Sequence, residues 1–135
     1  MWTYQQIDGK WLRANGTLLA IGYSGAGDGK NNPDMQNVEN VGPIPCGKYT
    51  MELIADDAGN PIDHKDAKGT TLHAPVIRLI PDPTNEMFGR VDFLIHGDNG
   101  LGTASLGCPV AARFARIAMW SSMDHDLNVV RGDGK

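Results

Sequence analysis

The stretch FLIHGDNGLGTASLGCPV, residues 93–110, joins an apolar segment to a histidine, a glycine-rich loop and a cysteine. The chain has four histidines and two cysteines, and this stretch places one of each, His96 and Cys108, at the two ends of one loop. The loop is short and contains glycines, so it can return beside the segment that it leaves. An imidazole held there can accept a thiol proton and later protonate a leaving amine, so we expect His96 and Cys108 to form a base and a nucleophile.

The segment after the cysteine has the spacing of an amphipathic helix, with one apolar stripe and with Arg113 and Arg116 away from it. The stripe consists of Val110, Phe114, Ile117 and Ala118. Pro109 suits a first helical turn, which would put Cys108 at the N-cap or the first position. Unpaired backbone N–H groups and the helix dipole lower the pKa of a thiol at such a site, and the thiolate is the reactive species.

Backbone N–H groups at the same turn are predicted to bind an oxyanion, from Cys108 together with Gly107 or Leu106. A cysteine that is merely a small buried apolar residue is the alternative to this catalytic interpretation. A zinc site would draw three or four ligands from Cys46, Cys108 and the histidines, but the sequence has no C-x-x-C or H-x-x-x-H spacing. We therefore expect no metal and no cofactor, and a Cys46–Cys108 disulfide has no support from the pattern.

Most of the remaining chain is predicted to be β-structure. Asp8-Gly9 and Asn15-Gly16 are typical hairpin turns and predict a three-stranded meander over residues 2–23. Further strands are expected in KYTMELI, APVIRLIP, VDFLI and LNVV, with a polar connection over residues 55–70. Residues 24–45 form a long loop, either a wall of a substrate cleft or a surface excursion. The fold class expected is mostly β with one helix after the cysteine.

Composition limits the function further. A chain of 135 residues suits a single domain, and its 41% hydrophobic and 21% charged residues suit a globular protein. The formal net charge is −4 with no basic block, which disfavours a nucleic-acid partner. No apolar run reaches the roughly 18 residues of a membrane span. The first residues lack the basic and apolar regions of a Sec signal peptide, so we expect synthesis in the cytoplasm without export by that route.

Three separated stretches carry a resemblance to a known family. They are GYSGAGDGKNNPDMQNVENVGPIPCGKYT, RLIPDPTNEMFGR and FLIHGD…ASLGC. Together they resemble the short domain of type VI secretion L,D-transpeptidase effectors, over nearly the whole chain from about Trp2 to Val130. The stretch from His96 to Cys108 is also similar to the His-Gly…Ser/Thr-His-Gly-Cys signature of YkuD-like L,D-transpeptidases.

The resemblance implies that residues 1–135 form one β-rich L,D-transpeptidase catalytic domain, a sandwich or barrel. Cys108 would be the nucleophile, His96 the base and Ser105 an orienting residue, while Gly107 would let the backbone approach the substrate. The YSG and GPIP segments would shape the cleft. The implied substrate-binding residues are Tyr23, Ser24, Gly25, His73, Gly97 and Asp98. His73 could instead orient His96 or cap a strand.

Three positions depart from the wider family pattern. Leu106 stands where the larger family has a second histidine, although the effector branch also lacks it. Pro109 replaces a branched apolar residue, and Val110 stands where many transpeptidases carry Asn or Arg. These changes affect the anchoring of substrate more than the nucleophile.

The implied reaction is acyl transfer on peptidoglycan stem tetrapeptides, in which Cys108 forms a thioester and D-Ala leaves. Water or an amine then completes a carboxypeptidase or a transpeptidase cycle. The implied role is an antibacterial toxin that acts in the periplasm of a target cell, with a secretion apparatus and a cognate immunity protein as partners. A phage or prophage lysis enzyme and a non-catalytic peptidoglycan-binding module are the alternatives.

Overall fold

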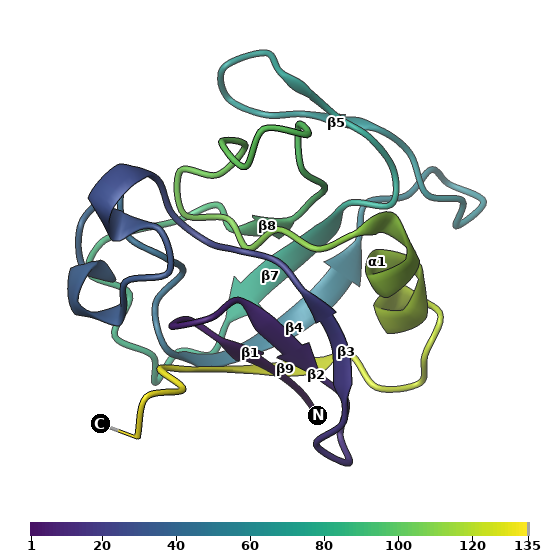
Figure 1. The fold of residues 1–135 in the computed structure, drawn as a ribbon. Helices are drawn as coiled ribbons and strands as arrows, with labels where there is room; N and C mark the ends of the chain where they lie inside the picture. The colour runs from purple at the N-terminus through teal and green to yellow at the C-terminus, as the bar shows by residue number, and fades with distance from the viewer. Residues whose placement is uncertain (135) are drawn as a thin grey trace.

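Seven strands form one curled sheet in the computed structural model, which describes residues 1–134 (Figure 1). Their order is β3-β2-β1-β9-β4-β7-β8, and β5 and β6 form a separate hairpin. The strands are β1 (Trp2–Gln5), β2 (Lys10–Leu12), β3 (Leu18–Ile21), β4 (Gly47–Leu53), β5 (His64–Lys65), β6 (Thr71–Leu72), β7 (Ile77–Pro81), β8 (Leu94–Ile95) and β9 (Asp126–Val130). Within the described residues there is one α-helix, α1 (Arg113–Trp120). The predicted fold class, mostly β with one helix after the cysteine, is confirmed.

The predicted meander over residues 2–23 is confirmed as the antiparallel strands β1, β2 and β3. Gly9 and Gly16 occupy the two turns with φ of +71° and +87°. Side chains avoid that left-handed region, so the Asp-Gly and Asn-Gly pairs place each turn where the strands must reverse.

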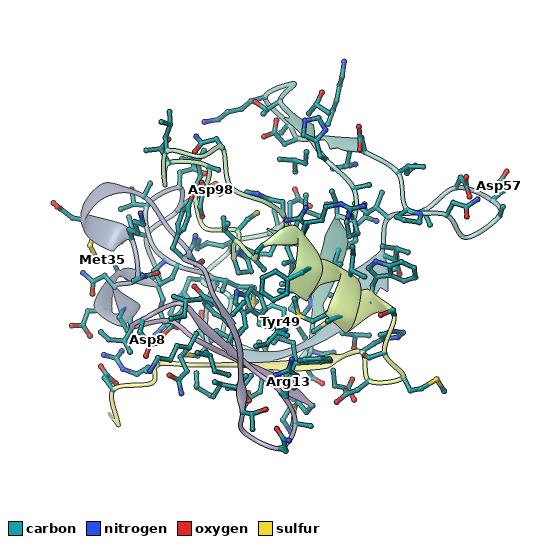
Figure 2. The ribbon with its side chains drawn as sticks, turned by 45° about the vertical axis from the view of Figure 1, so that its right-hand side comes forward. Asp8, Arg13, Met35, Tyr49, Asp57 and Asp98 are labelled. Carbon is teal, nitrogen blue, oxygen red and sulfur yellow. The ribbon has the colours of Figure 1, made fainter. Side chains whose placement is uncertain are left out.

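The core lies on one face of the sheet, because alternate residues of each strand point inward. In β4 these are Tyr49 and Met51, and they lie opposite Leu127 of β9 and Leu79 of β7. Strand β9 pairs in parallel with β1 and antiparallel with β4, so it joins the meander to the rest of the sheet. Figure 2 shows Tyr49 near the centre of the molecule, and Asp57 at the tip of a distant turn.

Val110 joins the two ends of the sheet. It forms an antiparallel bridge with Tyr23, just beyond β3, and a parallel bridge with His96, just beyond β8. Its N–H donates to the Tyr23 carbonyl at 2.7 Å, and the Ala111 N–H donates to the His96 carbonyl at 3.0 Å. Trp11 Nε1 donates to the Val110 carbonyl at 3.0 Å. The segment after Cys108 therefore closes the gap between the edge strands β3 and β8.

This closure explains why the helix starts later than predicted. Val110 and Ala111 are held in bridges, so the helix begins only at Arg113, after its N-cap Ala112, and Pro109 is outside it. The predicted apolar stripe was also wrong, since Phe114 is 61% exposed and the buried residues of α1 are Ala115, Arg116 and Met119. Arg116 is buried because its Nε and Nη1 donate to the carbonyls of Pro75 and Ala111.

Two connections differ from simple loops. The polar connection expected over residues 55–70 contains strand β5, which pairs with β6 in a hairpin that Figure 1 shows above the 97–106 loop. The long loop over residues 24–45 contains two short 3₁₀ helices, η1 (Gly27–Gly29) and η2 (Pro33–Met35). Asn32 caps η2 by accepting a hydrogen bond from the Asp34 N–H.

Gly22 is required by the closure, because a Cβ at this position would lie 1.7 Å from the Val110 carbonyl oxygen. We predict that Gly22→Ala lowers the free energy of unfolding by about 3 kcal/mol, since the Tyr23–Val110 bridge must open to admit the methyl group. Urea denaturation followed by tryptophan fluorescence measures this change.

Gly59→Ala is the matched control, because its φ is +84° but no atom lies within 4 Å of an added Cβ. It should cost about 1 kcal/mol of backbone strain. Equal losses in the two variants would contradict the role given to Gly22.

Candidate active site

Cys108 and His96 line the same groove, which has a volume of about 700 Å³. The groove runs between the β5–β6 hairpin and the segment that leads into β8. The long loop also contributes, through Glu39 and Asn40, so its predicted place as a cleft wall is supported. The hairpin contributes His64, Asp66, Ala67, Lys68 and Leu72, and β7 with the segment after it contributes Arg78, Leu79, Ile80, Pro81, Met87, Arg90, Val91, Asp92 and Phe93.

Cys108 is held in an extended loop beside β8, and the prediction of a helix N-cap position is wrong. Three residues separate it from Ala112, the N-cap of α1, so the helix dipole does not act on the sulfur directly. Its Sγ accepts a hydrogen bond from the Leu94 N–H at 3.4 Å, and the thiol points to the Asp92 carbonyl at 3.8 Å. The thiol is therefore fixed by the backbone of the strand that carries His96.

The thiol is neutral in this state. Burial raises the pKa of Cys108 to about 11, and the charges of Asp66 and Asp92 act in the same direction. The Leu94 N–H and the Arg90 guanidinium lower the pKa, but the effect of burial is larger. The lowered thiol pKa expected from a helix start is therefore corrected, because burial replaces the dipole as the main influence.

His96 is a buried, neutral imidazole with a defined tautomer. Its side chain is 4% exposed, and burial lowers its pKa, helped by the charge of Arg116. Nδ1 lies 2.8 Å from the Gly97 carbonyl oxygen. A carbonyl only accepts, so Nδ1 carries the proton and Nε2 keeps a free lone pair. The imidazole is thus prepared to accept a proton at Nε2.

The two side chains do not form a hydrogen bond with each other in this state. Among residues 1–134, the partners of Cys108 Sγ are the backbone atoms of Leu94 and Asp92. Proton transfer from sulfur to His96 Nε2 therefore requires the thiol hydrogen to turn away from the Asp92 carbonyl. Side-chain contacts of this kind commonly form only when substrate is bound.

Ser105 organises the loop that carries the cysteine. Its buried hydroxyl donates to the Cys108 carbonyl at 2.6 Å and accepts from the N–H groups of Gly25 at 2.9 Å and Gly107 at 3.0 Å. The N–H of Gly107 is therefore occupied. The other two backbone donors proposed for an oxyanion, the N–H groups of Cys108 and Leu106, have no acceptor among residues 1–134.

Gly107 is required by packing beneath the loop. Its φ is +138°, a value that favours glycine, and a Cβ there would lie 2.4 Å from Arg90 Nη2. Its carbonyl accepts a hydrogen bond from Ser24 Oγ at 2.6 Å. The glycine thus brings the backbone close to a buried guanidinium; the approach to substrate that the family resemblance implies for Gly107 stays a prediction.

The YSG segment supports the cysteine loop from behind. Tyr23 Oη donates to Asp98 Oδ1 at 2.6 Å and accepts from the Ala104 N–H at 2.8 Å, which ties both ends of the 97–104 loop to the segment just after β3. Lys30 Nζ lies 4.2 Å from the centre of the Tyr23 ring and donates to the Gly102 carbonyl. Figure 2 shows Asp98 on this loop. Ser24 and Gly25 hydrogen-bond to Gly107 and Ser105 in the same way, while Gly97 and Asp98 belong to the loop itself. None of these five predicted residues, Tyr23, Ser24, Gly25, Gly97 and Asp98, lines the groove.

His73 lies apart from the other predicted site residues. Its side chain is 81% exposed, its Nδ1 is 3.5 Å from Asp63 Oδ2, and it does not line the groove. The histidine that the hairpin does present to the groove is His64, together with Asp66. Sequence reasoning missed both because it read residues 55–70 as a polar connection.

Two buried arginines flank the cysteine and the histidine, and no motif in the sequence pointed to either. Arg90 donates to the carbonyls of Gln36, Gly42 and Pro43, and Arg116 donates to those of Pro75 and Ala111. Neither forms an ion pair with a carboxylate of residues 1–134. Positive charge therefore lies close to both members of the pair.

The described residues contain no group of three or more His, Cys, Asp or Glu side chains arranged to hold a metal ion. Cys46 and Cys108 are both free thiols, so they are not joined in a disulfide. No helix among residues 1–134 is long and apolar enough to cross a membrane.

Residues 19–131 match the family model of the Tlde1 domain. This match covers most of the chain, and the protein belongs to the Tlde1 domain family of type VI secretion effectors. Comparison with curated proteins and with solved structures gave no match.

We predict that Ser105→Ala lowers the free energy of unfolding by about 2 kcal/mol, because it leaves buried N–H groups of Gly25 and Gly107 without an acceptor. Urea denaturation measures the loss. Thr103→Ala is the control, since its hydroxyl contacts only the exposed side chain of Asn99 and should change stability by less than about 0.5 kcal/mol. A Ser105→Ala variant as stable as Thr103→Ala would contradict the organising role of Ser105.

The raised pKa of Cys108 predicts slow alkylation at neutral pH. Only the thiolate reacts, so in a Cys46→Ser background the rate with iodoacetamide should rise about tenfold for each pH unit between pH 7 and 9.5. Mass spectrometry of the intact protein measures the rate. A plateau below pH 9 would show that the thiol ionises far below the pKa of about 11.

Proposed function

We propose that this protein is a cysteine-dependent peptidoglycan L,D-carboxypeptidase or L,D-transpeptidase that acts on stem tetrapeptides through a thioester. One observation carries the proposal: the thiol of Cys108 and the imidazole of His96, whose free Nε2 can accept a proton, line one groove of about 700 Å³. That volume lies within the range of pockets that bind small ligands.

The charges of the groove support a stem peptide as substrate. Its lining includes the cations Lys68, Arg78 and Arg90 and the carboxylates of Glu39, Asp66 and Asp92. A stem tetrapeptide that ends in diaminopimelate and D-Ala carries both free carboxylates and an amine. A groove of mixed charge provides partners for both, whereas a substrate of one sign would leave half of the charged side chains opposed.

The neutral state of both groups defines the order of proton transfers. As Cys108 Sγ attacks the carbonyl carbon at the L-centre of diaminopimelate, its proton passes to His96 Nε2. The N–H groups of Cys108 and Leu106, which have no acceptor among residues 1–134, are the backbone donors for the resulting oxyanion. The C–N bond then breaks, the D-Ala amine takes the proton from the imidazolium, and a thioester remains on Cys108.

The second half of the cycle depends on the acceptor. Water gives an L,D-carboxypeptidase, while an amine gives a cross-link or a D-amino-acid exchange. We propose both activities for this protein. Action in the periplasm of a target cell and neutralisation by an immunity protein follow from the effector family as proposals.

Purified muropeptides provide the test. We predict that the wild-type protein releases D-Ala from tetrapeptides, and that Cys108→Ala and His96→Ala reduce the rate by at least about 100-fold, because each removes a group that takes part in bond formation or proton transfer. Mass spectrometry of the products measures the release.

Cys46→Ala and His73→Ala are the matched controls, because these residues lie outside the groove and should leave the rate within about twofold of wild type. Muropeptides that stay intact in the presence of reduced wild-type protein would contradict the proposal. Binding of those muropeptides without cleavage would indicate a non-catalytic binding module.

A further inference from the structure

Arg90 is a buried cation without an anionic partner. It is 5% exposed, and no carboxylate of residues 1–134 lies close enough to its guanidinium to form an ion pair. Nη1 donates to the carbonyls of Gln36 and Pro43 at 2.6 and 2.8 Å, and Nη2 donates to that of Gly42 at 3.0 Å. These carbonyls fix the guanidinium but leave its charge uncompensated, which is rare for a buried arginine.

The guanidinium lies directly beneath the cysteine loop. An added Cβ at Gly107, the residue before Cys108, would lie 2.4 Å from Arg90 Nη2. The ring of Phe93 is 5.2 Å from Arg90 Cζ and covers another side of the guanidinium. Arg90 and Cys108 both line the groove. Long-loop carbonyls, an aromatic ring and the cysteine loop thus surround this charge.

Of the groups near Arg90, Cys108 is the one that can become its anionic partner when the thiol loses its proton. Arg90 faces Tyr49 of β4, Glu39 of the long loop and Cys108. Burial keeps the Tyr49 hydroxyl protonated by raising its pKa, and Glu39 is exposed to solvent, which screens its charge. The other charged groups near the sulfur are Asp66 of the hairpin and Asp92 of the segment before β8, and both oppose ionisation.

We propose that Arg90 is a positioning residue that stabilises the thiolate of Cys108 as its counter-ion during the reaction. The catalytic meaning of this role rests on the function proposed above, but the pairing itself concerns only the thiol. When the proton leaves sulfur for His96, the negative charge forms beside a guanidinium already held by three carbonyls. The fixed cation does not have to reorient, so it stabilises the thiolate without a reorganisation cost.

Alkylation of Cys108 by iodoacetamide at pH 8, in a Cys46→Ser background, tests this role. In the reaction the thiolate displaces iodide, so the rate follows the thiolate fraction. Arg90→Met should lower the rate about tenfold, the effect of a rise of one unit in the thiol pKa, whereas Arg90→Lys keeps the charge and should lose less than about threefold. Arg78→Met is the control, because Arg78 also lines the groove but is exposed and paired with Glu52.

Near-ultraviolet circular dichroism checks that each variant is folded. Equal alkylation rates in folded Arg90→Met and wild type, or an equal loss in Arg78→Met, would overturn the proposal. A loss in Arg90→Met alone, with rescue by lysine, supports it.

If Arg90→Met does not fold, reagent charge decides the question in a protein that keeps Arg90. Lys68→Met and Arg78→Met together leave Arg90 as the one Lys or Arg among the groove-lining residues. In that protein, the ratio of the rates with iodoacetate and iodoacetamide should exceed the ratio for N-acetylcysteine amide by at least about threefold, because the cation attracts the anionic reagent. A ratio equal to or below that of the free thiol would overturn the proposal.

The two proposals can fail separately. Alkylation that depends on Arg90 without any release of D-Ala would remove the peptidoglycan function and leave the Arg90–Cys108 pair. Release of D-Ala with alkylation that is independent of Arg90 would do the reverse.

Discussion

The site depends on the backbone contacts of Val110. Its two bridges, to Tyr23 and to His96, connect the edges of a sheet that would otherwise stay open. Edge strands present unpaired backbone groups, and burying those groups without partners is costly. Closure at this point satisfies them, and it also fixes Cys108 two residues before Val110 and beside the strand that leads to His96. The same short segment, residues 108–110, therefore closes the sheet and positions the thiol.

Electrostatics at the site come from arginines held by carbonyls. Arg90 lies near the sulfur and favours a negative charge on Cys108. Arg116 lies near the imidazole and opposes a positive charge on His96. In the resting protein, burial is the stronger effect and keeps both side chains neutral. A neutral pair avoids the cost of two desolvated charges. The positive charge at the site therefore belongs to the two arginines, and His96 is neutral.

Much of the fold followed from local patterns in the sequence. The Asp-Gly and Asn-Gly turns predicted the meander, and the alternation of apolar residues in β4 predicted a half-buried strand. Both signals depend only on residues close together in the chain. The pairing of loop ends also identified His96 and Cys108 as candidates that share a groove. The helix start was misjudged, since the bridges of Val110 and Ala111 are tertiary contacts that override a helical apolar period.

The supporting residues of the site could not be found in the same way. Arg116 looked like a solvent-facing residue of an amphipathic helix, yet carbonyls from distant segments bury it. Gly22 has no positive φ and resembles any strand glycine, and only the approach of the Val110 carbonyl explains it. The β5–β6 hairpin is formed by two very short strands in a polar segment, where no apolar period exists. These features arise from contacts between segments far apart in the sequence.

The place of β9 in the sheet has a consequence for how the chain folds. This strand lies between β1 and β4, although it is synthesised after every other strand described here. On the ribosome, strands β1 to β3 and strands β4, β7 and β8 can pair before residues 126–130 emerge, but the strand that lies between β1 and β4 is still missing. Pairing over such long sequence separations makes folding slow. The seven-stranded sheet is therefore completed only after residues 126–130 have been synthesised, because β9 is the strand that joins β1 to β4.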